Sequence, residues 1–249
     1  MQYQPQADFL KDKIILVTGA GDGLGQAASI AYAAHGATVV LLGRTIKKLE
    51  KTYDDIVNAG YPEPAIYPLN LEGATPKDYE DLADTLKEQF GGLHGLLHNA
   101  AIFGVTSPVQ QHDIDLWYKV MQVNLNAPFI MTRALLPLLR ETAGSKIIFT
   151  TDDKTHAYWG AYAVSKDAIT GFMKVIGDEL DTENNSVQVN AINPGPVRTQ
   201  FRVRSFPGEN PDTMPTAESV MPTYLYVMSD DCKEIAQTIC AQQDQSSLA

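Results

Sequence analysis

The sequence predicts an α/β fold in which helices cover both faces of a doubly wound, parallel sheet. Two observations carry this prediction. Short runs rich in valine and isoleucine recur along the chain, and each is followed by a longer segment with helical periodicity. Because most of these runs are uninterrupted by polar residues, we expect helices to bury both faces of the sheet.

Seven strands and six helices are expected. The strands are predicted at residues 13–18, 37–43, 65–69, 94–98, 145–151, 186–192 and 237–241. The helices are predicted at residues 24–35, 46–59, 76–90, 114–141, 161–180 and 217–228. The segment 194–215 is rich in proline, glycine and charge and is long for a connection, so we expect an irregular substrate loop there.

Composition limits the domain number and the partners. A chain of 249 residues with 44% apolar content can bury one large core. No repeat or linker divides it, so we expect one domain over residues 1–249, with a short arm at 1–10. The net charge of −11 disfavours nucleic acid and anionic membranes as partners. With no signal peptide and only two cysteines, a cytoplasmic protein without a metal site is expected.

A glycine-rich turn joins the first predicted strand to the first predicted helix. Such a turn allows positive φ and close approach of the backbone, and the helix start offers free N–H groups to phosphate. The turn therefore predicts a dinucleotide site of the Rossmann type, although a plain strand-to-helix turn would look similar. The residues concerned are Gly19, Gly21, Asp22, Gly23, Leu24, which packs the helix on the sheet, and Gly25.

The end of the second predicted strand favours NADP(H). NAD-specific sites place an acidic residue there for the ribose 2′-hydroxyl, whereas this strand ends in Gly43 and Arg44. The Arg44 guanidinium could bind a 2′-phosphate, or it could simply be solvated. Asp22 in the glycine turn weakens the argument, so NAD(H) remains the alternative.

A tyrosine and a lysine are spaced one helical turn apart at the start of the fifth predicted helix. Tyr162 and Lys166 then share a face, and the lysine charge is expected to lower the pKa of the phenol. A phenol with a lowered pKa can donate and accept protons near neutral pH.

The motifs of this chain, and their order along it, resemble those of the short-chain dehydrogenase/reductase family. Gly19, Gly23 and Gly25 form G-x-x-x-G-x-G, which is unlike the spacing of extended, epimerase-type relatives. The other matching motifs are His98-Asn99-Ala100-Ala101, Val123-Asn124-Leu125-Asn126, Tyr162 with Lys166, and Asn193-Pro194-Gly195. The Leu41-Leu42-Gly43-Arg44 strand end is similar to a group of poorly characterised bacterial oxidoreductases.

The resemblance implies roles for individual residues. Tyr162 would be the acid or base, and Lys166 would hold the nicotinamide ribose. Asn124 would interrupt its helix and bind a water that relays protons. The alternative for Asn124 is a buried amide that forms hydrogen bonds with the helix backbone. Cofactor contacts are implied for Asn70, Leu71, Asn99, Ala100, Ala101, Pro194, Gly195, Val197 and Thr199.

One catalytic position departs from the family pattern. The serine that follows the fifth strand in the family is replaced by Asp152, with Thr151 before it. An ionised Asp152 cannot donate a hydrogen bond to a carbonyl, so it would have to be protonated, or Thr151 would have to act instead. Asn70 and Ala101 also differ from the usual aspartate and glycine.

The sequence therefore predicts an oxidoreductase that transfers hydride between NADP(H) and a small-molecule carbonyl or alcohol. The alternative is a catalytically impaired dinucleotide-binding protein with a regulatory or interaction role. If the family habit holds, the two longest predicted helices mediate a homodimer or homotetramer. The arginines of the substrate loop, Arg198, Arg202 and Arg204, could bind an acidic substrate, although solvent exposure is the favoured interpretation.

Overall fold

A single parallel sheet organises the computed structural model, which describes residues 3–152, 155–181 and 187–242. Its strand order is β3-β2-β1-β4-β5-β6-β7, and every neighbouring pair is parallel. The predicted doubly wound sheet is confirmed. The sixth strand was expected to begin at Ser186, which lies outside the described residues. The strands are β1 (Ile14–Thr18), β2 (Thr38–Gly43), β3 (Ala65–Pro68), β4 (Gly95–His98), β5 (Lys146–Thr150), β6 (Gln188–Asn193) and β7 (Thr238–Cys240).

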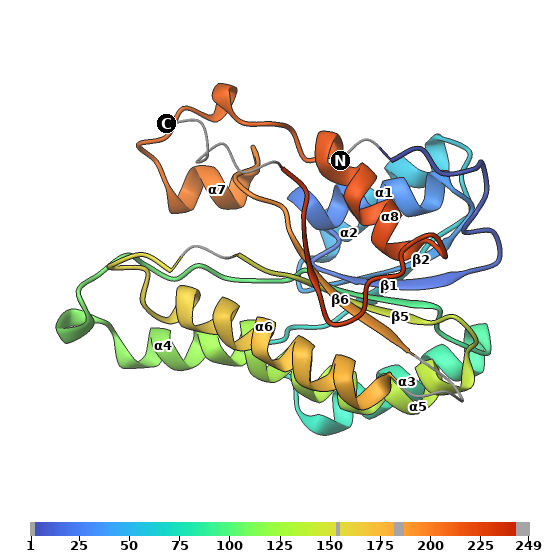
Figure 1. Cartoon of the computed structure of the whole chain (residues 1–249), viewed down its shortest axis with the longest axis horizontal. Helices are drawn as coiled ribbons and strands as arrows, with labels where there is room; N and C mark the ends of the chain where they lie inside the picture. Colours follow the sequence, from blue (N-terminus) through green and yellow to red (C-terminus); the bar gives the residue numbers. More distant parts are fainter. Residues whose placement is uncertain (1–2, 153–154, 182–186, 243–249) are drawn as a thin grey trace.

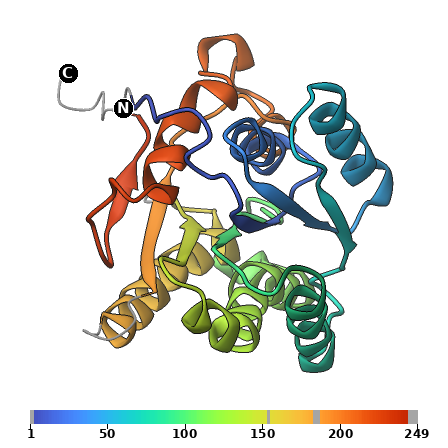
Figure 2. The ribbon, with the colours of Figure 1, turned by 90° about the vertical axis from the view of Figure 1, so that its right-hand side faces the viewer.

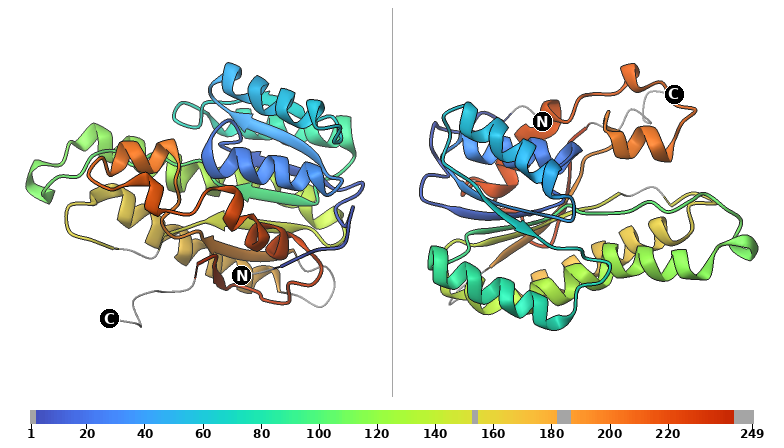
Figure 3. Two further views of the ribbon diagram at one scale, coloured as in Figure 1. Left: turned by 90° about the horizontal axis from the view of Figure 1, so that it is seen from above. Right: turned by 180° about the vertical axis from the view of Figure 1, so that it is seen from behind.

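Helices cover both faces of this sheet, as Figure 1 shows. One face carries α1 (Gly23–Ala34), α2 (Ile46–Asn58) and α8 (Met221–Met228), and the other carries α3 (Pro76–Phe90), α5 (Ala127–Glu141) and α6 (Gly160–Leu180). Figure 2 shows α3, α5 and α6 side by side below the sheet. The view from behind in Figure 3 shows the same two layers.

Alternating side chains of the strands build a separate core on each face. In β1, Ile15 and Val17 pack with α1, α2 and α8, whereas Leu16 between them packs with α3, α5 and α6. All three are fully buried. A strand that is apolar at every position therefore serves two cores, as the uninterrupted runs predicted.

Local signals explain why α3 has the predicted bounds. Thr75 and Asp78 form a capping box at its start, with Pro76 in the first turn. Gly91, at φ 73°, ends the helix in the left-handed conformation that glycine adopts without strain.

Three predicted segments are corrected by the structure. The helix expected at 114–141 is α4 (Ile114–Met121) and α5 joined by the π-turn η2 (Gln122–Asn126). The segment 194–215 is not irregular throughout, because it contains α7 (Gln200–Ser205), whose first turn is capped by the Thr199 side chain. The helix expected from residue 217 begins as a 3₁₀ turn, and α8 starts only at Met221, where Pro222 fits the first turn.

Among the described helices, none is long and apolar enough to span a membrane. Within the same part of the chain, no three His, Cys, Asp or Glu side chains are grouped so as to hold a metal ion.

Candidate active site

A cavity of about 530 Å³ opens where the strands end, and it brings most of the predicted site residues together. The turns that follow β1 to β6 all contribute to its wall. Of the predicted residues, Gly25 and Asn124 do not line it, although their neighbours Leu24 and Val123 do. The glycine turn and the Tyr162–Lys166 pair therefore face one continuous space.

The glycine turn has no room for larger residues at two positions. Gly19 has φ 70°, and a Cβ there would lie 3.1 Å from Ala100 Cα. At Gly25 a Cβ would lie 2.2 Å from the Gly19 carbonyl oxygen, which belongs to backbone that cannot yield. The turn thus brings bare backbone and the start of α1 to the cavity, an arrangement that fits a pyrophosphate.

Thr18 connects this turn to the segment that follows β4. Its buried Oγ1 accepts hydrogen bonds from the backbone N–H groups of Asn99, at 2.9 Å, and Ala100, at 3.0 Å, and donates to the Leu97 carbonyl at 3.3 Å. Sequence reasoning missed this role, because a threonine at the end of a strand carries no pattern of its own.

Two basic residues stand at the start of α2, beside the cavity. Arg44 is exposed and lines it as predicted, and Lys48 lines it one helical turn later. Lys48 forms an ion pair with Asp22 of the glycine turn. The charge of Asp22 is therefore partly neutralised. A lysine in the first turn of the helix that follows Arg44 was the signal that could have identified this second base.

Tyr162 and Lys166 lie on one face of α6, both buried. The Lys166 Nζ atom lies 5.7 Å from the centre of the Tyr162 ring and donates to the Thr150 carbonyl at 2.7 Å. Burial lowers the pKa of Lys166 to about 8, although the Asp152 charge acts to raise it.

The predicted lowering of the phenol pKa is wrong for this structure. Burial raises the pKa of Tyr162, and the charge of Asp152 and its hydrogen bond raise it further. The charge of Arg202 acts in the opposite direction with a smaller effect. Tyr162 is thus held in its protonated form, as a neutral hydrogen-bond donor.

Asp152, rather than Thr151, faces the tyrosine. The hydroxyl of Thr151 is buried, lies 2.8 Å from the Thr170 hydroxyl and donates to the Lys166 carbonyl at 3.3 Å. Thr151 therefore fixes β5 to α6. The carboxylate of Asp152 instead shares a hydrogen bond with the Tyr162 side chain.

Asn124 lies in the π-turn that interrupts the helix, as the family resemblance implied. Its Oδ1 accepts from the Ile102 N–H at 2.9 Å, and its Nδ2 donates to the Ile102 carbonyl at 2.9 Å and to Ser165 Oγ at 3.0 Å. These bonds reach the segment after β4 and a side chain of α6, not the backbone of the helix that carries Asn124, so the stated alternative is not what the structure shows. The relay water stays a prediction. Asn124 thereby fixes the segment 99–104 against α6.

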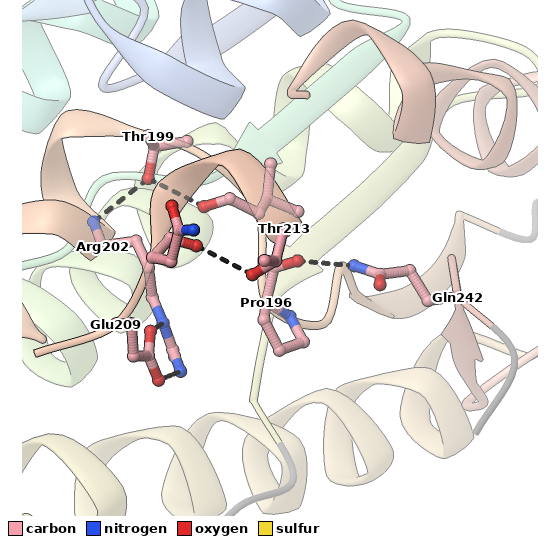
Figure 4. Close-up of polar contacts among 8 residues, drawn as sticks. Pro196, Thr199, Arg202, Glu209, Thr213 and Gln242 are labelled. Atoms are coloured by element: carbon pink, nitrogen blue, oxygen red, sulfur yellow. Dashed lines mark hydrogen bonds and ion pairs between the residues drawn. The ribbon is translucent and has the colours of Figure 1, made fainter. Parts of the chain in front are cut away.

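The segment after β6 is held by residues far along the chain (Figure 4). Gln242 Nε2 donates to the Pro194 carbonyl at 2.7 Å and to the Pro196 carbonyl at 2.8 Å. The Thr199 hydroxyl accepts from the Arg202 N–H at 3.2 Å and so caps α7. The sequence reading did not identify Gln242, because a lone glutamine beyond the last strand gives no signal.

The other predicted cofactor residues line the cavity through backbone or local turns. Asn99 Nδ2 donates to the Thr18 carbonyl at 3.3 Å, and Asn70 Oδ1 accepts from the Glu72 N–H at 3.3 Å. The rest of this group has apolar side chains or none and also lines the wall: Leu71, Ala100, Ala101, Pro194, Gly195 and Val197.

The chain matches known proteins along most of its length. The model of the short chain dehydrogenase family matches residues 13–210. YciK, an uncharacterized oxidoreductase of Escherichia coli K12, is 42% identical over 236 residues, which cover 94% of this chain and 92% of that protein. The structure of a short chain dehydrogenase from Salmonella enterica serovar Typhi superposes with a TM-score of 0.93 at 42% identity, over 97% of this chain and 100% of that one.

A further solved structure, from Escherichia coli CFT073, is a complex with NADPH. It has a TM-score of 0.92 and 41% identity to this chain, and the match covers 96% of this chain and 100% of that one.

Proposed function

The chain belongs to the short-chain dehydrogenase family of oxidoreductases, and on that premise we propose that it transfers hydride between NADP(H) and a carbonyl or alcohol. The observation that carries the proposal is the continuous cavity that joins the glycine turn to Tyr162 and Lys166. A cofactor bound at the turn would extend toward the Tyr162 phenol. A carbonyl that accepts hydride must also gain a proton, and the phenol would supply it at that place.

The residues of the turn would hold the pyrophosphate through the N–H groups at the start of α1. Backbone lies too close to Gly25 for a side chain, and Gly19 combines a positive φ with a close approach of Ala100, which fits a cradle for phosphate. The Pro194–Val197 backbone, held by Gln242, would border the nicotinamide end.

The preference for NADP(H) over NAD(H) is supported by Arg44 and Lys48. Both line the cavity after β2, where a 2′-phosphate would be bound, and Lys48 can exchange Asp22 for that phosphate. The NADPH complex of the relative from Escherichia coli CFT073 points in the same direction.

When bound, NADPH would supply the hydride that the substrate carbon gains in reduction, and NADP⁺ would accept the hydride that this carbon loses in oxidation. In reduction, Tyr162 donates its hydroxyl proton to the substrate oxygen; in oxidation, it takes that proton back. The Lys166 ammonium stabilises the phenolate that remains. Because an ionised Asp152 would oppose negative charge on the substrate oxygen, we propose that Asp152 is protonated while the substrate is bound.

The resemblance also implies a homodimer or homotetramer, which we propose to form through α4, α5 and α6. Large apolar side chains are exposed on these helices: Ile114, Tyr118, Phe129, Val164 and Val175. Light scattering of the wild type and of Val175→Glu tests this, and a monomeric wild type would contradict it. The cytoplasmic location stays a prediction.

The first experiment is a fluorescence titration of the protein with NADPH and, separately, with NADH. Tight NADPH binding and weak NADH binding are expected. Carbonyl compounds are then tested for NADPH oxidation with the wild type and with Tyr162→Phe, which should bind NADPH but transfer no hydride. Failure of both cofactors to bind would contradict the proposal, and binding without hydride transfer would favour the impaired alternative.

A further inference from the structure

Four aromatic rings surround Tyr162 at the end of the cavity opposite Arg44. We call Phe103, Trp159, Tyr162, Phe201 and Phe206 the aromatic cluster. The ring centres of Phe103, Phe201 and Trp159 lie 4.9, 5.9 and 6.0 Å from that of Tyr162. Phe206 lies 5.0 Å from both Phe103 and Trp159.

Three separate segments supply these rings. Phe103 follows β4 and is positioned by the bonds between Asn124 and its neighbour Ile102. Trp159 precedes α6, and Phe201 and Phe206 come from the α7 segment. Phe103, Tyr162 and Phe201 line the cavity itself, so their rings are available to a molecule bound there.

The charges near the cluster do not favour an anionic substrate. The Arg202 guanidinium donates to both Glu209 carboxylate oxygens, at 2.7 and 2.6 Å, and lies 3.9 Å from the centre of the Phe206 ring. Arg198 is paired with Asp212 at 3.0 Å. Of the two loop arginines that line the cavity, Arg202 is therefore already paired with Glu209, and Arg204 is exposed to solvent.

We propose that the substrate is an uncharged carbonyl or alcohol whose reacting carbon bears an aromatic ring. With its oxygen at the Tyr162 hydroxyl, a ring attached to that carbon would meet Phe103 and Phe201, where edge-to-face and offset contacts favour a π system over an aliphatic ring. This rests on the proposed oxidoreductase function and adds the substrate class to it.

The test compares two methyl ketones and one keto acid of similar size in protein saturated with NADP⁺, which cannot reduce them. Dissociation constants of acetophenone, cyclohexyl methyl ketone and phenylglyoxylate are measured by ligand-observed NMR titration. Acetophenone should bind about 5-fold more tightly than cyclohexyl methyl ketone, as expected for ring contacts beyond simple burial. Equal binding of the two ketones, or tightest binding of phenylglyoxylate, would overturn the inference.

A pair of matched variants locates the effect. Phe201→Leu keeps an apolar side chain but removes one ring, and should reduce the preference for acetophenone about 3-fold. Phe90→Leu makes the same change at the end of α3, where Phe90 packs on the core and does not line the cavity, and should leave the preference unchanged. Equal effects of the two variants would contradict the assignment of the cluster.

Turnover with NADPH separates this inference from the function on which it rests. Reduction of both ketones with equal kcat/KM would support the oxidoreductase and overturn the aromatic preference. Tighter binding of acetophenone with no reduction of any ketone would support the aromatic site and contradict the proposed function.

Discussion

Replacing Thr18 with valine removes one hydroxyl and almost no volume. That hydroxyl is 1% exposed and accepts hydrogen bonds from the backbone N–H groups of Asn99 and Ala100, at 2.9 and 3.0 Å. Each buried donor left without a partner costs about 1 to 3 kcal/mol, and partial relaxation of the turn reduces the sum. We therefore expect Thr18→Val to lose about 3 kcal/mol of unfolding free energy.

Thr52→Val is the matched control. Thr52 is also fully buried, but its hydroxyl donates, to the carbonyls of Ala20 at 3.0 Å and Lys48 at 3.2 Å. Carbonyl oxygens tolerate the loss of a donor better than N–H groups tolerate the loss of an acceptor. The same substitution should therefore cost only about 1 kcal/mol at Thr52.

Urea unfolding at one fixed protein concentration measures both variants. A loss of about 3 kcal/mol in a chain of this size corresponds to a fall in Tm of about 6 to 12 °C. Thr18→Val should also weaken NADPH binding, since Asn99 and Ala100 line the cavity. If Thr18→Val loses no more stability than Thr52→Val, the argument from unsatisfied donors is refuted.

Three further predictions concern the cofactor and the lysine. Arg44→Ala should weaken NADPH binding about 10- to 100-fold and leave NADH binding within about 3-fold, in parallel titrations; equal losses would contradict a phosphate contact. Gln242→Leu leaves the carbonyls of Pro194 and Pro196 without their donor, so NADPH affinity should fall about 10-fold; an unchanged titration would show that the bonds do not matter. The pKa of Lys166 is lowered to about 8 from the ordinary value of 10.5, so between these pH values the unfolded chain binds a proton that the folded chain has lost. The free energy of unfolding of the wild type, relative to Lys166→Met, should therefore rise by about 2 kcal/mol between pH 7 and pH 10 in urea unfolding. A difference that falls over this range would refute the lowered pKa.

The sequence was informative where a physical requirement repeats along the chain. Apolar runs, most of them uninterrupted, predicted the seven strands of the described sheet, because a strand covered on both faces needs apolar residues at most positions. The helix predicted at residues 76–90 has those bounds in the structure, where a capping box and Gly91 stand at its two ends. The glycine turn and the spacing of Tyr162 and Lys166 placed those residues at one cavity, since parallel strands bring the following turns to the same edge.

What could not be predicted depends on single contacts between distant segments. The roles of Thr18 and Gln242 rest on hydrogen bonds across 81 and 48 positions, which no local pattern signals. The phenol pKa was predicted in the wrong direction because the spacing reveals a neighbouring charge but not burial, which dominates at Tyr162. α7 was missed because proline and glycine around it indicate a loop, whereas the Thr199 cap makes one short helix possible.

The bonds from Gln242 to the Pro194 and Pro196 carbonyls make the site dependent on the order of synthesis. Every residue that lines the cavity precedes Gln242 along the chain, and β7, which carries Gln242 toward the loop, is the last strand to leave a ribosome. A nascent chain with six strands in place would still hold these two carbonyls in water. A truncation that removes Gln242 would therefore act on the wall of the cavity as directly as a substitution within it.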